Sequence, residues 1–167
     1  MTETREIVGE ILKGYALPVR GHHGVAHWAR VLENGLRLVE ATGADARVVT
    51  LFALFHDCRR LNESHDEGHG WRGGDFARSL RGCLVRLPDP DFELLFLACR
   101  LHTEGLTHGD VTLQACWDAD RLDLGRVGIT PSPERLGTPA ARALLRWADQ
   151  RAVSGYEPEI VTKEWWL

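Results

Sequence analysis

An apolar run that ends in two adjacent ionisable residues limits how this chain can fold. Residues 51–60 read LFALFHDCRR, and the apolar part of this stretch suits a packed interior, so His56 and Asp57 are expected to enter the interior with it. A buried carboxylate is costly unless a positive charge lies against it. No lysine is close to Asp57 in the sequence. The sequence therefore predicts that Asp57 has a cationic partner elsewhere, and a metal ion would be suitable.

Length and composition predict one domain over residues 1–167, large enough to bury a substantial core. The chain is 44% hydrophobic and 26% charged, the balance of a soluble globular protein. A net charge of −4 argues against nucleic acid as the main partner. Four cysteines without CxxC spacing are typical of reduced thiols. No signal peptide and no apolar stretch of about 18 residues is recognisable, so we expect a cytoplasmic protein without a membrane span.

Apolar residues recur at helical spacing along most of the chain. Asp45 and Asp89 are expected N-caps, Gly43 is an expected helix stop, and the polar, Gly-rich residues 61–74 are expected to form a loop. Strand-like alternation is absent, so the predicted fold class is all-α, a bundle of six or seven helices around one core. The predicted helices cover approximately residues 3–17, 25–42, 46–58, 75–86, 90–102, 112–125 and 139–153.

Histidines and aspartates stand at the predicted helix ends and in loops. His27 lies near the start of one helix, His56 and Asp57 close the next, and Asp120 lies in a later one. Such positions allow several elements to converge on one pocket. Neutral imidazole and ionised carboxylate are preferred ligands of borderline divalent metals. Taken together these residues indicate a metal site, whereas any one histidine alone would more simply be a hydrogen-bonded core residue.

Three blocks in order, HWARV at 27–31, HD at 56–57 and DADRLD at 118–123, resemble the H…HD…D signature of the HD-domain superfamily of metal-dependent phosphohydrolases. The resemblance covers residues 25–125 and implies an HD-domain-like helical bundle around a metal site. It makes His27, His56, Asp57 and Asp120 ligands of one ion. Asp120 is chosen because the last ligand of the family usually precedes a basic residue and a leucine, as in ADRL.

The resemblance also bears on neighbouring residues of the signature. Asp118 and Asp123 are expected either to orient ligands or to be charges on a helix face. Members with two metal ions carry two further histidines between HD and the last aspartate, with the HD aspartate bridging the ions. His69, in HGWRGGDFA, and His102, in RLHTEG, match these intervals, although many such members have adjacent histidines where this chain has His102–Thr103. One or two divalent ions (Mn, Fe, Ni, Co or Zn) are expected.

The activity implied by the resemblance is hydrolysis of a phosphate ester or nucleotide by a metal-activated water. A bound ion lowers the pKa of water from about 15.7 toward 7. Asp57, Arg60 and Arg121 are the candidate catalytic residues, and either guanidinium could form a fork onto a phosphate or belong to a structural ion pair. The expected partner is a small, nucleotide-like phosphorylated molecule and not a membrane, and a homo-oligomer is left open.

Two other functions remain open at this stage. HD-fold diiron oxygenases that resemble myo-inositol oxygenase use the same six ligands, so the ligand set does not separate the two chemistries. A metal-holding sensor or partner-binding module without turnover is the other alternative, with Trp165 and Trp166 as a docking patch or as part of the core. The roles of His22 and His23 are also left open.

Overall fold

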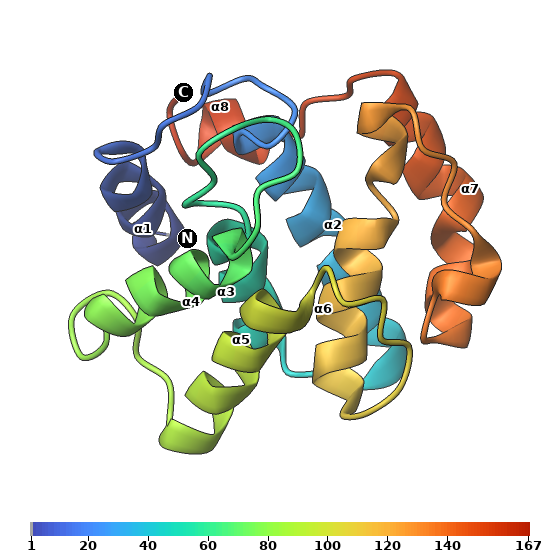
Figure 1. Cartoon of the computed structure of the whole chain (residues 1–167), viewed down its shortest axis with the longest axis horizontal. Helices are drawn as coiled ribbons and strands as arrows, with labels where there is room; N and C mark the ends of the chain where they lie inside the picture. The colour runs from blue at the N-terminus through green and yellow to red at the C-terminus, as the bar shows by residue number, and fades with distance from the viewer. Residues whose placement is uncertain (1) are drawn as a thin grey trace.

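Figure 1 shows how the helices are arranged in the computed structural model, which describes residues 2–167. They pack around a continuous apolar core. Within this range the protein contains α-helices and two short 3-10 helices and no strand, which confirms the all-α prediction. The described residues form eight α-helices, one more than the upper number predicted. The elements are α1 (Thr2–Leu12), α2 (Val25–Thr42), α3 (Ala46–Phe55), α4 (His69–Ser79), α5 (Asp89–Leu101), α6 (Val111–Arg121), η1 (Leu124–Val127), η2 (Pro133–Arg135), α7 (Pro139–Val153) and α8 (Ile160–Lys163).

Helix α3 lies at the centre of the bundle. Its apolar side chains from Val48 to Phe55 are buried on nearly every face of the helix, because α2, α5 and α6 all pack against it. Asp45 caps its start by accepting hydrogen bonds from the backbone amides of Arg47 and Val48, as predicted. Gly43 ends α2 in the left-handed region at φ 74°, where glycine is favoured. The apolar part of the LFALFHDCRR stretch is therefore an interior helix, and His56 and Asp57 follow it into the core.

Helix α4 corrects the prediction that residues 61–74 are loop and that a helix covers 75–86. The helix begins at His69 and ends at Ser79. The glycines that suggested a loop instead allow close packing, because a Cβ at Gly73 would lie 2.1 Å from the carbonyl oxygen of Phe55, and one at Gly70 would lie 2.1 Å from that of Cys99. Close helix packing thus outweighs the low helix propensity of glycine here.

Several other helix boundaries differ from the predicted ones. Helix α1 ends at Leu12, and α6 ends at Arg121 and is followed by the 3-10 helix η1. Asp89 is the first residue of α5, and Pro88 is its N-cap. The one-turn helix α8 was not predicted, and it places Trp165 in the core while Trp166 stays 71% exposed. Among the described residues, no helix has both the length and the apolar character needed to cross a membrane.

A pair of glycine substitutions tests the role of close packing at α4. Gly73→Ala should lower the free energy of unfolding by about 3 kcal/mol, because the new methyl group must displace backbone at the end of α3. Gly9→Ala is the matched control in α1, where an added Cβ meets no atom within 4 Å, and it should raise the free energy by about 0.5–1 kcal/mol. Urea denaturation measures both values. Equal effects of the two substitutions would contradict the packing argument.

Candidate metal centre

The ends of five helices meet at one buried cluster of histidines and aspartates, which we call the candidate metal centre, or the centre for short. It contains all six residues that the sequence analysis named as ligands, and each is buried except Asp120, whose side chain is 14% exposed. They are His27 near the start of α2, His56 and Asp57 directly after α3, His69 at the start of α4, His102 directly after α5, and Asp120 in the last turn of α6.

The first half of the centre surrounds oxygen Oδ2 of Asp57. The Nε2 atoms of His27 and His56 lie 3.0 Å apart, and they lie 3.5 and 3.8 Å from this oxygen. Oxygen Oδ1 of Asp120 completes the group at 3.5 and 3.7 Å from the same two nitrogens. Ligands that share one ion at about 2.0–2.2 Å lie roughly 3–3.5 Å from one another. The spacing therefore suits one metal ion among these four side chains.

The second half of the centre surrounds the other oxygen of the same carboxylate. The Nε2 atoms of His69 and His102 lie 2.9 Å apart, and they lie 3.1 and 3.7 Å from Oδ1 of Asp57. His27, His56 and Asp57 form one group that could hold an ion, and Asp57, His69 and His102 form another. Asp57 belongs to both groups and presents one oxygen to each, an arrangement suited to a bridging carboxylate.

Hydrogen bonds on the far side of each ring show why a cation fits between the nitrogens. The Nδ1 atoms of His56, His69 and His102 each lie 2.6–3.0 Å from a backbone carbonyl oxygen, which can only accept a hydrogen bond. Nδ1 of His27 lies 2.7 Å from Oδ2 of Asp123. Each Nδ1 therefore carries the proton, and in a neutral ring each Nε2 presents a lone pair. Two lone pairs facing each other at about 3 Å call for a cation between them.

The carboxylates of the centre are held in their charged form. Burial by itself raises the pKa of Asp57, but interactions with His56, His102 and His27 bring that pKa well below its usual range. Burial likewise raises the pKa of Asp120, and interactions with His56 and Arg126 more than reverse this effect. Oδ1 of Asp120 is moreover buried and accepts no hydrogen bond from the described residues. Ionised, buried oxygens of this kind are suitable metal ligands.

Asp123 and Asp118, both left open by the sequence, have different surroundings. Asp123 accepts from His27 and receives two hydrogen bonds from Arg30, at 2.7 and 3.1 Å, so it orients a proposed ligand. Asp118 instead accepts hydrogen bonds from the backbone amides of Gly137 and Thr138. It fixes the start of α7.

The two predicted arginines border the centre in different ways. Arg60 lies 3.4 Å from Oδ1 of Asp57 and 3.1 Å from Nε2 of His69, while its other nitrogens donate to the backbone oxygens of Asn62 and Ser64. Arg121 donates to the carbonyl oxygen of Arg135 and lies 4.0 Å from Asp118. Arg60 is therefore next to the proposed ligands, whereas Arg121 is hydrogen-bonded to the segment before α7.

Arg126 and the pair His23–Glu63 are neighbours that the sequence analysis did not place. Nη2 of Arg126 lies 3.9 Å from Oδ2 of Asp57, and Nη1 lies 3.9 Å from Oδ1 of Asp120. In the sequence, only its closeness to the DADRLD block indicated a role for this arginine.

His23 is hydrogen-bonded to Glu63, and its ring is 6.2 Å from that of His27. Burial lowers the pKa of His23 to about 4. His22 is exposed.

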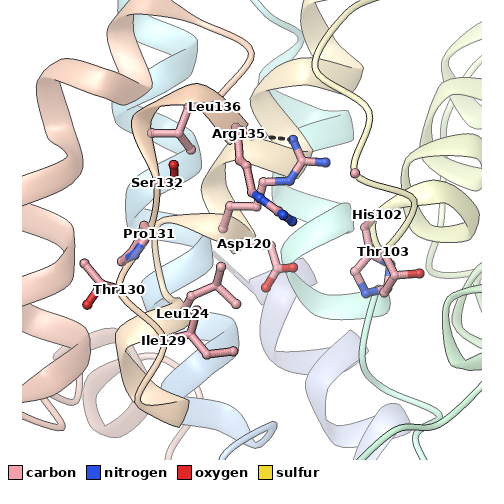
Figure 2. A pocket seen from close by; sticks show the side chains of 12 residues that line it. His102, Thr103, Asp120, Leu124, Ile129, Thr130, Pro131, Ser132, Arg135 and Leu136 are labelled. Carbon is pink, nitrogen blue, oxygen red and sulfur yellow. Dashed lines mark hydrogen bonds between the residues drawn. The ribbon is translucent and has the colours of Figure 1, made fainter.

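Two cavities open beside the centre. The first, of about 530 Å³, has the loop of Ile129–Leu136 on one side and His102 with Thr103 on the other, with Asp120 between them (Figure 2). Its lining is mainly apolar and also contains Arg121 and Arg135. The second, of about 660 Å³, is lined by polar residues that include Arg60 and His69. The centre is thus reachable from both halves.

No protein-family model and no curated protein matches the chain. Among solved structures it is similar to the crystal structure of a predicted HD superfamily hydrolase from an uncultured Thermotogales bacterium. The two sequences are 26% identical, and the match covers 91% of this chain and 86% of the other with a TM-score of 0.67. This likeness confirms the resemblance to the HD superfamily that the three sequence blocks indicated.

Metal content tests the two halves of the centre separately. We expect two ions per chain in the protein purified without a chelating column, one in His102→Gln, and almost none in Asp57→Asn, because Asp57 faces both groups. The exposed His108 provides the control, since His108→Gln should keep both ions. Elemental analysis gives the metal-to-chain ratios. A ratio of one that His102→Gln leaves unchanged would contradict a second ion.

The hydrogen bond between Asp123 and His27 gives a second prediction for this centre. Asp123→Asn should weaken binding of the ion in the first half by about 10–100-fold, because His27 loses the carboxylate that fixes its orientation. Binding in the second half should stay unchanged. Competitive titration with a chromogenic chelator measures both affinities, with the exposed Asp75→Asn as control. Equal weakening in both halves would indicate general unfolding instead.

Proposed function

We propose that this chain, which has the HD-superfamily fold, is a metal-dependent phosphohydrolase that acts on a small phosphorylated molecule. The observation that carries the proposal is the convergence of four imidazole Nε2 atoms on the two oxygens of one buried carboxylate, that of Asp57. The similar structure is described as a predicted hydrolase, which supports hydrolysis as the general chemistry.

The proposed ligand set fits the ions that such chemistry requires. His27, His56 and Asp120 would hold one divalent ion, His69 and His102 the other, and Asp57 would bridge them. When bound, ions of this kind activate water for attack on phosphorus and neutralise charge on the phosphate oxygens. The protein itself fixes the imidazole tautomers through the Nδ1 hydrogen bonds, so each Nε2 is free to ligate an ion.

Charge around the centre supports an anionic substrate. Three carboxylates lie at the centre, those of Asp57, Asp120 and Asp123. Three guanidinium groups lie within 4 Å of them, those of Arg30, Arg60 and Arg126. The site is therefore close to neutral before any ion binds. Adding divalent ions makes it strongly positive, and a phosphate group would restore the balance. A neutral substrate would leave that charge uncompensated in a largely buried site.

The 530 Å³ cavity is the proposed position of the organic part of the substrate. It borders the centre at Asp120 and His102, and its walls combine apolar side chains such as Leu124 and Ile129 with Arg121. A pocket that is mainly apolar with a few polar groups is typical of small-molecule sites. This supports a phosphate ester with a nucleotide-sized organic group, with the phosphate directed toward the metal centre.

Activity measurements test this function directly. Protein loaded with manganese, nickel, cobalt, iron or zinc should release phosphate from one or more members of a panel of phosphate esters and nucleotides, and Asp57→Asn should reduce release to the level of metal-free protein. His108→Gln is again the control. An iron pair with oxygen uptake and no phosphate release would support an oxygenase instead. Bound metal with neither activity would support a sensor or binding module.

A further inference from the structure

The guanidinium group of Arg126 lies beside the first half of the metal centre. Its Nη2 is 3.9 Å from Oδ2 of Asp57, and its Nη1 is 3.9 Å from Oδ1 of Asp120. Both oxygens belong to the group proposed to hold the first ion. Its side chain is only 8% exposed, so the charge is largely removed from solvent. Arg126 comes from η1, immediately before the loop that forms one wall of the 530 Å³ cavity.

Two backbone oxygens hold this guanidinium in place. Nε donates to the carbonyl oxygen of His22 at 2.9 Å, and Nη1 donates to that of Asp123 at 3.1 Å. Nη2 donates to no acceptor among the described residues, since 3.9 Å to Asp57 exceeds hydrogen-bond distance. Arg126 is therefore a fixed, nearly buried side chain that directs an unused donor toward the centre.

Neutralising the carboxylates alone does not account for this placement. Asp123 is already paired with Arg30 through two hydrogen bonds. Asp57 and Asp120 would be neutralised by the ions they are proposed to bind. A guanidinium so close to a divalent ion is repelled by it, unless an anion lies between the two charges.

We propose that Arg126 binds an oxygen of a tetrahedral oxyanion, such as phosphate, that occupies the metal centre, with Nη2 as the donor. The inference rests on the metal-dependent hydrolase function proposed above and adds a substrate-binding residue to it. Arg60 and Arg121 are less suited to this role. Two nitrogens of Arg60 already donate to the carbonyl oxygens of Asn62 and Ser64. Arg121 donates to the carbonyl oxygen of Arg135, and the carboxylate beside it is that of Asp118, which is not a proposed ligand.

Binding of inorganic phosphate to the manganese-loaded full chain tests the proposal without relying on turnover. Arg126→Gln should weaken phosphate binding by about tenfold or more, because a charge-assisted hydrogen bond is lost. The same substitution should leave manganese affinity unchanged or increase it, because it removes a positive charge next to the ion. The phosphate affinity of Arg126→Lys should lie between those of the unaltered protein and Arg126→Gln. Arg86→Gln, on the surface, is the control for both measurements.

Calorimetric titration of phosphate and of manganese separates the outcomes. Phosphate affinity in Arg126→Gln within about twofold of the unaltered protein would overturn the proposal, as would failure of the unaltered, manganese-loaded protein to bind phosphate. Loss of manganese in both Arg126 variants would show that the residue supports the ligand carboxylates, and would also overturn it. Phosphate binding that depends on Arg126 in a protein without hydrolase activity would uphold the inference while rejecting the proposed function.

Discussion

The buried carboxylate of Asp57 is the group on which the arrangement of this protein depends. It lies at the end of the most apolar helix, where an isolated negative charge would be strongly unfavourable. Each of its oxygens faces a pair of imidazole nitrogens that come from different helices. The bundle therefore has to bring the ends of α2, α3, α4, α5 and α6 together at one point, and its packing can be understood from that requirement.

Close backbone contacts make this convergence feasible. Helix α4 begins with His69, and Gly70 and Gly73 allow its backbone to touch the last turns of α5 and α3. A Cβ at either position would collide with a backbone carbonyl oxygen of α5 or α3, so α4 could not pack this closely against both helices. The same stretch of sequence thus supplies a proposed ligand and the space that the ligand needs, which is why a segment with loop-like composition is helical here.

The sequence allowed the proposed ligands to be named because their spacing resembles that of a known family, and because apolar periodicity placed most of them at helix ends. It did not predict that α4 begins at His69, since local composition favoured a loop and the deciding contacts come from distant carbonyl groups. Arg126 was missed for a related reason. Its importance comes from its distance to Asp57 and Asp120 in space, which helical periodicity does not encode.

The hydrogen bonds behind the imidazoles divide the centre into a local and a non-local part. His56, His69 and His102 each use a backbone carbonyl three or four residues earlier, at Phe52, Asp66 and Cys99. These rings are therefore oriented by their own helix ends and loops.

The orientation of His27 instead depends on Asp123, 96 residues away, which is held in turn by Arg30. Because Arg30 is one turn after His27 on α2, this helix contributes both a proposed ligand and the anchor for the carboxylate that orients it. The docking of α6 against α2 therefore decides whether the first half of the centre is assembled, whereas the second half depends on the contact between α4 and α5.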